Sequence, residues 1–110
     1  MSITVNLYYT GTNGSARKFA EEMESSGTAA AIRAEDGNER YAYFASLSDP
    51  ETILLIDAWK DQAAIDAHHA SPMMGKIAEL RNKYDLHMKA ERYITDEAGF
   101  SAADSSFIRK

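Results

Sequence analysis

The segment Ile53 to Trp59, which reads Ile-Leu-Leu-Ile-Asp-Ala-Trp, places the strongest requirement on the fold. Apart from Asp57, its residues are apolar at both odd and even positions. Side chains of a β-strand alternate between the two faces of a sheet, so a strand here needs burial on both faces. In a 110-residue chain, helices can cover one face, and a second sheet must cover the other. A second copy of the chain is the simplest source of that sheet, so we expect a homodimer packed sheet to sheet.

The hydrophobic pattern predicts strands at 3–10, 39–47, 52–60 and 86–94. Helical spacing follows the first and third of these strands, through Ala16, Phe19, Ala20 and Met23, and through Met73, Ile77, Leu80 and Tyr84. A short helix is expected at 29–34 after a Thr28 cap, and another begins after an Asp61 cap. The order predicts a ferredoxin-like α+β sandwich, βαββαβ, with helices on one face of an antiparallel sheet.

The composition and the C-terminal residues predict the extent of the domain, the kinds of partner and the location of the protein. We expect one domain over residues 1–95 and a C-terminal tail over 96–110, which Phe100, Phe107 and Ile108 could anchor. The chain has 12 Lys and Arg against 17 Asp and Glu, which argues against a nucleic-acid partner. It has no secretory leader, no long apolar run and no cysteine, so we expect a cytoplasmic protein without a membrane partner, disulfide or thiolate nucleophile.

His68 is the first candidate for chemistry. It follows Ile65 by three residues and Ala64 by four, so it lies on the apolar face of the expected helix. An imidazole in a dry pocket acts as a general acid or base near neutral pH, whereas a core histidine only donates to a carbonyl. The sequence leaves both roles open. The next residue, His69, lies about 100° around the helix and is expected at solvent or at a subunit boundary.

Asp57 and Trp59 share one face at the end of the 52–60 strand. An unpaired buried carboxylate is costly, so Asp57 either reaches water at the strand end or pairs with a basic side chain. The candidates for that pair are His68, Arg40 and Arg92. Trp59 either stacks on a flat substrate or packs in the core.

Other side chains are candidates for lining a ligand cavity. Asn6 is polar in mid-strand, and it either hydrogen-bonds a ligand or makes a cross-strand contact. Aromatic and thioether side chains that line a cavity or fill the core are Tyr8, Tyr41, Tyr43, Phe44, Met73, Met74 and Tyr84. The chain has no His-Glu-x-x-His, phosphate loop or serine nucleophile motif, so we expect neither a metal site nor a nucleotide site.

The stretch from Leu54 to Pro72 resembles the signature of the antibiotic biosynthesis monooxygenase family. That signature has an acidic residue two before a Trp, an Asp two after it, an Ala–aliphatic pair, a His nine after the Trp, and Ser- or Thr-Pro. The matching residues here are Asp57, Trp59, Asp61, Ala64, Ile65, His68, Ser71 and Pro72. Glu35-Asp36-Gly37 resembles the family's Glu-Xaa-Gly, and Gly11 to Gly14 loosely match its Pro-Gly. The resemblance covers roughly residues 2–95.

This resemblance implies a dimeric α+β barrel and a monooxygenase that oxidises a quinol- or anthrone-like aromatic with dioxygen and no cofactor. An electron-rich phenolate reduces dioxygen directly, and the protein supplies a dry cavity, a proton acceptor and donors for the developing oxyanion. The resemblance assigns the proton to His68, with Asp57 or a tyrosine orienting it. It assigns substrate contacts to Asn6 and Trp59, with Tyr43, His69 and Met73 as further candidates.

Other branches of the same family leave alternatives open. Many members carry a second His just after the Ser-Pro, where this chain has Met73. The haem-degrading branch needs an iron-ligating His on the helix where this chain has Met73, Ile77 and Ala78, so no haem is expected. An autoinducer-2-type phospho-sugar isomerase would need basic phosphate ligands, for which Arg40, Lys76, Arg81 and Arg92 are the candidates. A non-catalytic dimeric module that binds a small molecule or acts in stress is the alternative from another class.

Overall fold

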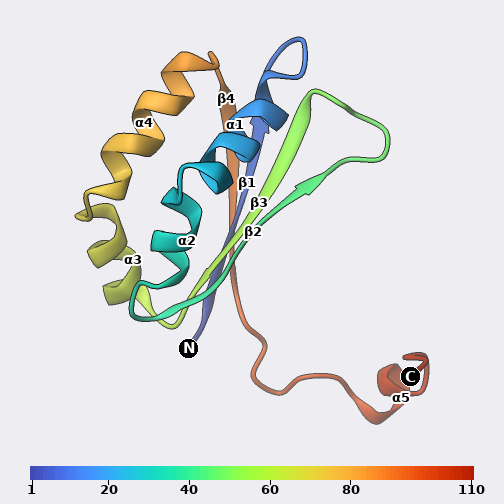
Figure 1. Ribbon diagram of the computed structural model, residues 1–110. Helices are drawn as coiled ribbons and strands as arrows, with labels where there is room; N and C mark the ends of the chain where they lie inside the picture. The colour runs from blue at the N-terminus through green and yellow to red at the C-terminus, as the bar shows by residue number, and fades with distance from the viewer.

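The computed structural model describes residues 1–110 and contains a four-stranded antiparallel sheet with helices on one face (Figure 1). The strands are β1 (Ile3–Thr10), β2 (Asn38–Ala45), β3 (Thr52–Trp59) and β4 (His87–Ile94), in the order β2-β3-β1-β4. The helices are α1 (Ser15–Ser25), α2 (Thr28–Arg33), α3 (Gln62–His69), α4 (Met73–Lys83) and α5 (Ala102–Ser105). The predicted ferredoxin-like α+β fold is confirmed.

Strand β3 lies inside the sheet and is enclosed on its helix side. Ile53, Leu55, Asp57 and Trp59 are all buried on that side. On the other face, which we call the open face, Leu54 and Ile56 are only half-buried, and Figure 1 shows no helix covering it. On this face β3 presents the apolar side chains of Leu54 and Ile56, as the sequence predicts for a strand that needs burial on both sides.

The helices bury the faces that their spacing predicts. In α1 the buried residues are Ala16, Phe19, Ala20 and Met23. Asp61 caps α3 by accepting a hydrogen bond from the Ala64 backbone N–H at 2.8 Å, and this cap fixes where α3 begins. Ile77 and Leu80 are buried in α4, while Met73 and Tyr84 at the two ends of the same stripe are half-buried.

Several element boundaries differ from the prediction by one or two residues. Strand β2 ends at Ala45, two residues early, because the Ser46 hydroxyl accepts from the backbone N–H of Ser48 and of Asp49 and starts the turn. Leu47, predicted on the buried face of that strand, is therefore fully exposed. Strand β4 begins at His87, since the Leu86 N–H bonds back to the end of α4. Thr28 is the first residue of α2 rather than its cap, which is Gly27.

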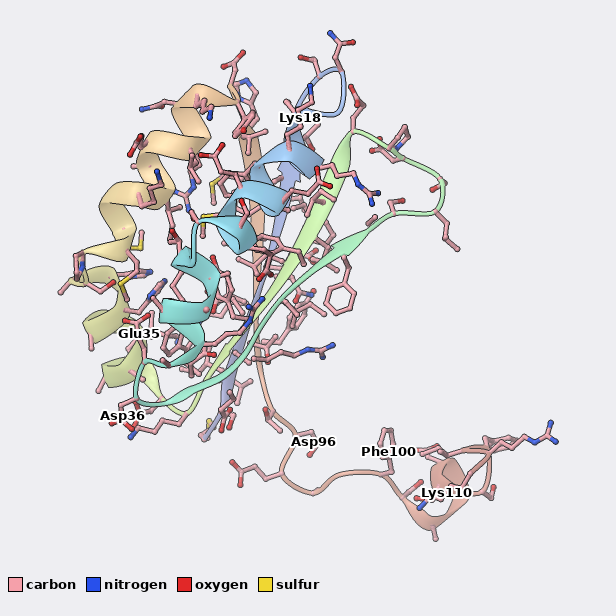
Figure 2. The ribbon with its side chains drawn as sticks, in the orientation of Figure 1. Lys18, Glu35, Asp36, Asp96, Phe100 and Lys110 are labelled. Atoms are coloured by element: carbon pink, nitrogen blue, oxygen red, sulfur yellow. The ribbon has the colours of Figure 1, made fainter.

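The C-terminal segment leaves the body of the molecule after β4. Residues 96–110 run away from the sheet and end in the short helix α5 (Figures 1 and 2). Phe100, Phe107 and Ile108 are exposed, so the structure does not show the anchoring that we expected from them. The division at residue 95 stays a prediction. No helix of the chain has both the length and the apolar character to cross a membrane.

Candidate functional site

His68 lies buried between α3 and the sheet. The helix phase set by the Asp61 cap puts His68 on the same face as Ala64 and Ile65, and the residue is only 4% exposed. Its ring stacks on the Trp59 indole, with centroids 4.7 Å apart and planes at 28°. His69 is exposed, as predicted, with its ring centroid 5.7 Å from that of His68.

Glu35 is the hydrogen-bond partner of the His68 imidazole. Its Oε2 lies 2.7 Å from His68 Nδ1 although 33 residues separate the two in the sequence. Glu35 lies in the turn between α2 and β2, and Figure 2 shows it on the side of that turn facing the helices, with Asp36 at the outer end. We expected Asp57 or a tyrosine in this orienting position; the structure places the carboxyl of Glu35 there instead.

Asp57 is bound to Trp59 and to none of the basic side chains proposed for it. The Trp59 indole Nε1–H donates to Asp57 Oδ1 at 2.6 Å, and Asp57 is 8% exposed. Burial raises the pKa of Asp57 to about 7, the hydrogen bond from Trp59 opposes this rise, and the nearby Glu35 charge adds to it. A carboxyl group with a pKa near neutrality in a buried position is a feature of functional sites.

A small cavity of about 40 Å³ joins these residues to α4. Its lining consists of Leu7, Tyr9, Tyr41, Leu55, Asp57, His68, His69, Met74, Ile77 and Arg81. The guanidinium of Arg81 donates through Nη2 to the Tyr9 hydroxyl at 3.2 Å, while its Nε is buried without a hydrogen-bond partner. Burial raises the pKa of Tyr9, and the charge of Arg81 opposes that rise. The cavity thus brings together an imidazole, a carboxyl, a phenol and a cation.

The remaining predicted site residues lie elsewhere. Asn6 is on the open face of the sheet, opposite Ile56 in the register, so the sheet separates it from His68. Its Oδ1 is buried without a partner. Tyr43 pairs its hydroxyl with that of Tyr41 at 3.1 Å and lines a separate groove of about 270 Å³ beside α1. Met74, rather than Met73, reaches the cavity. Trp59 contacts His68 directly but is 1% exposed, which leaves it no free surface for a ligand.

Three members of the site were not assigned to it from the sequence. Glu35 belongs to the Glu-Xaa-Gly match, which indicates the family but not a contact with His68. Tyr9 shares the helix-facing side of β1 with Leu7, so the alternation of that strand could have placed it. The sequence indicates Arg81 only as a candidate phosphate ligand. No three His, Cys, Asp or Glu side chains gather closely enough to hold a metal ion.

Comparison with known proteins shows the family to which the chain belongs. The sequence model of the family named antibiotic biosynthesis monooxygenase matches residues 2–80, which include Glu35, Asp57, Trp59 and His68. The chain therefore belongs to the antibiotic biosynthesis monooxygenase family. No curated protein matches it.

Several solved structures share the fold. One from Deinococcus radiodurans, provisionally named an antibiotic biosynthesis monooxygenase, is 22% identical with a TM-score of 0.76, over 92% of this chain and 98% of that one. SnoaB, a cofactor-independent oxygenase from Streptomyces nogalater, is 17% identical with a TM-score of 0.72, over 87% of this chain and 94% of that one. A conserved protein from Methanosarcina mazei is 21% identical with a TM-score of 0.73, over 84% and 91%. At these identities the likeness shows the fold alone.

Proposed function

We propose that this protein is a monooxygenase that oxidises a quinol- or anthrone-like aromatic with dioxygen and without a cofactor of its own. The observation that carries the proposal is the convergence of His68, Asp57 and Arg81 on one buried cavity. A site of this kind offers a proton acceptor and a fixed positive charge in surroundings of low polarity, where both act strongly. The family membership of the chain supports the oxygenase class.

The proposed reaction needs only groups that the cavity holds. His68 takes the hydroxyl proton of the substrate, and the resulting anion gives electrons to dioxygen. A carbon–oxygen bond forms, and His68 returns the proton to the peroxide oxygen to give a hydroperoxide. The hydrogen on the oxygenated carbon then leaves as a proton, its bonding electrons form the new carbonyl, and the oxygen–oxygen bond breaks, so that the distal hydroxide leaves with that proton as water. Arg81, whose Nε has no partner in the chain, stabilises the negative charge on the substrate or on the peroxide oxygen. For an anthrone the balance is anthrone plus dioxygen to anthraquinone plus water.

The size of the cavity bears on this proposal. A small-ligand pocket usually has a volume of several hundred Å³, whereas the cavity beside His68 has about 40 Å³. Substrate binding therefore requires the cavity to widen, and the exposed His69 and the half-buried, flexible Met74 are lining side chains that can move. The small volume favours a second candidate function, a non-catalytic module that binds a small molecule elsewhere on the fold.

The isomerase alternative has less support from the positions of the basic residues. Only Arg81 of the four candidate cations lines the cavity. Arg40 lies over the Phe44 ring, and Lys76 pairs with Glu79. A phosphorylated sugar would need several cations converging on one point.

We also propose that two copies of the chain pack through their open faces. Leu54 and Ile56 on this face are half-buried, and Phe44 is exposed beside them. Apolar side chains gathered on an uncovered part of a sheet are typical of a contact site between proteins. A second identical sheet would cover all these residues and would enclose Asn6 as well.

Oxygen uptake by the metal-stripped protein tests the catalytic proposal. A panel of hydroquinones and anthrones is compared for the wild type, the His68→Asn variant and the His87→Asn variant, whose histidine is exposed on β4. We expect uptake above autoxidation in the wild type and His87→Asn, and its loss in His68→Asn. Uptake equal to autoxidation for every substrate would contradict the proposal and favour the non-catalytic module.

A further inference from the structure

The contact between Glu35 and His68 determines which nitrogen of the imidazole is free to react. The two side chains are 16% and 5% exposed, and Nε2 of His68 has no hydrogen-bond partner in the chain. A carboxylate offers acceptor oxygens only, so the hydrogen of the 2.7 Å contact belongs on His68 Nδ1. We propose that Glu35 is a positioning residue, which holds His68 in the tautomer that leaves the lone pair on Nε2. The consequence for turnover rests on the proposed function, whereas the tautomer itself does not.

The turn that carries Glu35 is fixed against the start of α3. Gly37 adopts a φ of 84°, and its carbonyl accepts from the Lys60 N–H at 2.9 Å. A Cβ at Gly37 would lie 2.8 Å from the Ala64 Cβ, so only glycine allows the turn to approach the helix this closely. The Asn38 N–H closes the turn onto the Glu35 carbonyl at 3.1 Å. The backbone therefore places Glu35 within reach of His68.

Glu35 supplies a restraint that the Trp59 stack cannot. Stacking at 28° fixes the plane of the His68 ring, but a half-turn about χ2 preserves that plane and the ring's shape. The half-turn would exchange Nδ1 with Cδ2 and Nε2 with Cε1. The lone pair on Nε2 would then point in a different direction. A hydrogen bond at Nδ1 is broken by the half-turn, and so it selects one of the two orientations.

Glu35 also borders the molecular surface, so its replacement should leave the fold intact. Glu35 also lines a groove of about 360 Å³ with Asp36 and Lys60, on the surface of the molecule. A different side chain at position 35 can therefore turn into this groove instead of being forced into the core. Asp36, which is almost fully exposed and lies 3.3 Å from Lys60 Nζ, loses the same charge in an Asp36→Asn control without touching His68.

Nitrogen NMR of ¹⁵N-histidine-labelled protein tests the inference. The chain has three histidines, and the His68→Asn spectrum identifies the signals of His68. At a pH where His68 is neutral, we expect the wild type and Asp36→Asn to show a protonated Nδ1 and a bare Nε2. Glu35→Gln keeps an acceptor oxygen and should keep this tautomer. Glu35→Leu should give a mixture of both tautomers, and its melting temperature shows that it is folded.

Turnover on an active aromatic substrate gives the second readout. We expect kcat to fall about 100-fold in Glu35→Leu and less than about 10-fold in Glu35→Gln, with KM unchanged, because Glu35 does not touch the substrate. A protonated Nε2 in the wild type, or an unchanged tautomer in folded Glu35→Leu, would overturn the inference. If no variant turns over any substrate, the proposed function fails, and the tautomer measurement still decides the role of Glu35.

Discussion

Replacing Asp57 with asparagine should stabilise the protein above neutral pH. Asp57 has a pKa of about 7 in the folded chain against an ordinary value of 3.8, because its carboxyl is buried. The folded state thus binds the Asp57 proton more tightly than the unfolded state does. Its contribution to stability is complete below about pH 4 and is lost as the pH rises to about 7. Over the whole range the loss is about 4 kcal/mol, of which about 3 kcal/mol falls between pH 5 and 8.

Urea unfolding at a series of pH values from 5 to 8 measures this effect. The Asp57→Asn variant keeps an acceptor for the Trp59 indole and has no proton to lose. The difference in free energy of unfolding, variant minus wild type, should therefore grow by about 3 kcal/mol across that range. Asp66→Asn, which changes an exposed carboxyl on α3, should run parallel to the wild type. A parallel course for Asp57→Asn as well would refute the account of this carboxyl as a buried acid.

Three further variants test separate parts of the structure. Trp59→Phe removes the donor to Asp57 and should cost about 1–3 kcal/mol in urea unfolding, more at pH 8 than at pH 5; an equal cost at both would contradict the pairing. Arg81→Met should lower kcat/KM for oxygen uptake about 100-fold, and unchanged kinetics would exclude an oxyanion role. Ile56→Asp on the open face should reduce the mass in sedimentation to the 12.2 kDa of one chain, whereas a wild type already at that mass would contradict the dimer.

The fold could be predicted from the sequence because its signals are local. Strand alternation, the helical spacing of Phe19 with Met23, and the Asp61 cap each act within a few residues. The error at the end of β2 also has a local cause. The Ser46 hydroxyl accepts hydrogen bonds from the next backbone N–H groups and starts a turn, which the pattern of apolar residues does not indicate.

The site was harder to predict because it depends on register and on distant segments. Asn6 lies on β1, and Asp57 lies on the neighbouring strand β3. In the register Asp57 is opposite Val5, so the Asn6 side chain lies on the other face of the sheet. Reading the two strands in register would have separated them. Glu35 reaches His68 across 33 residues through the Gly37 turn, and no spacing within one element indicates such a contact.

We propose that this cavity inserts oxygen from dioxygen into an aromatic substrate without a cofactor. The most direct measurement is mass spectrometry of the quinone formed from an anthrone by the metal-stripped protein under ¹⁸O₂. We predict one ¹⁸O atom in each product molecule, at a rate above autoxidation that His68→Asn abolishes. Product formed only at the autoxidation rate, or labelled equally fast with His68→Asn, would contradict the claim.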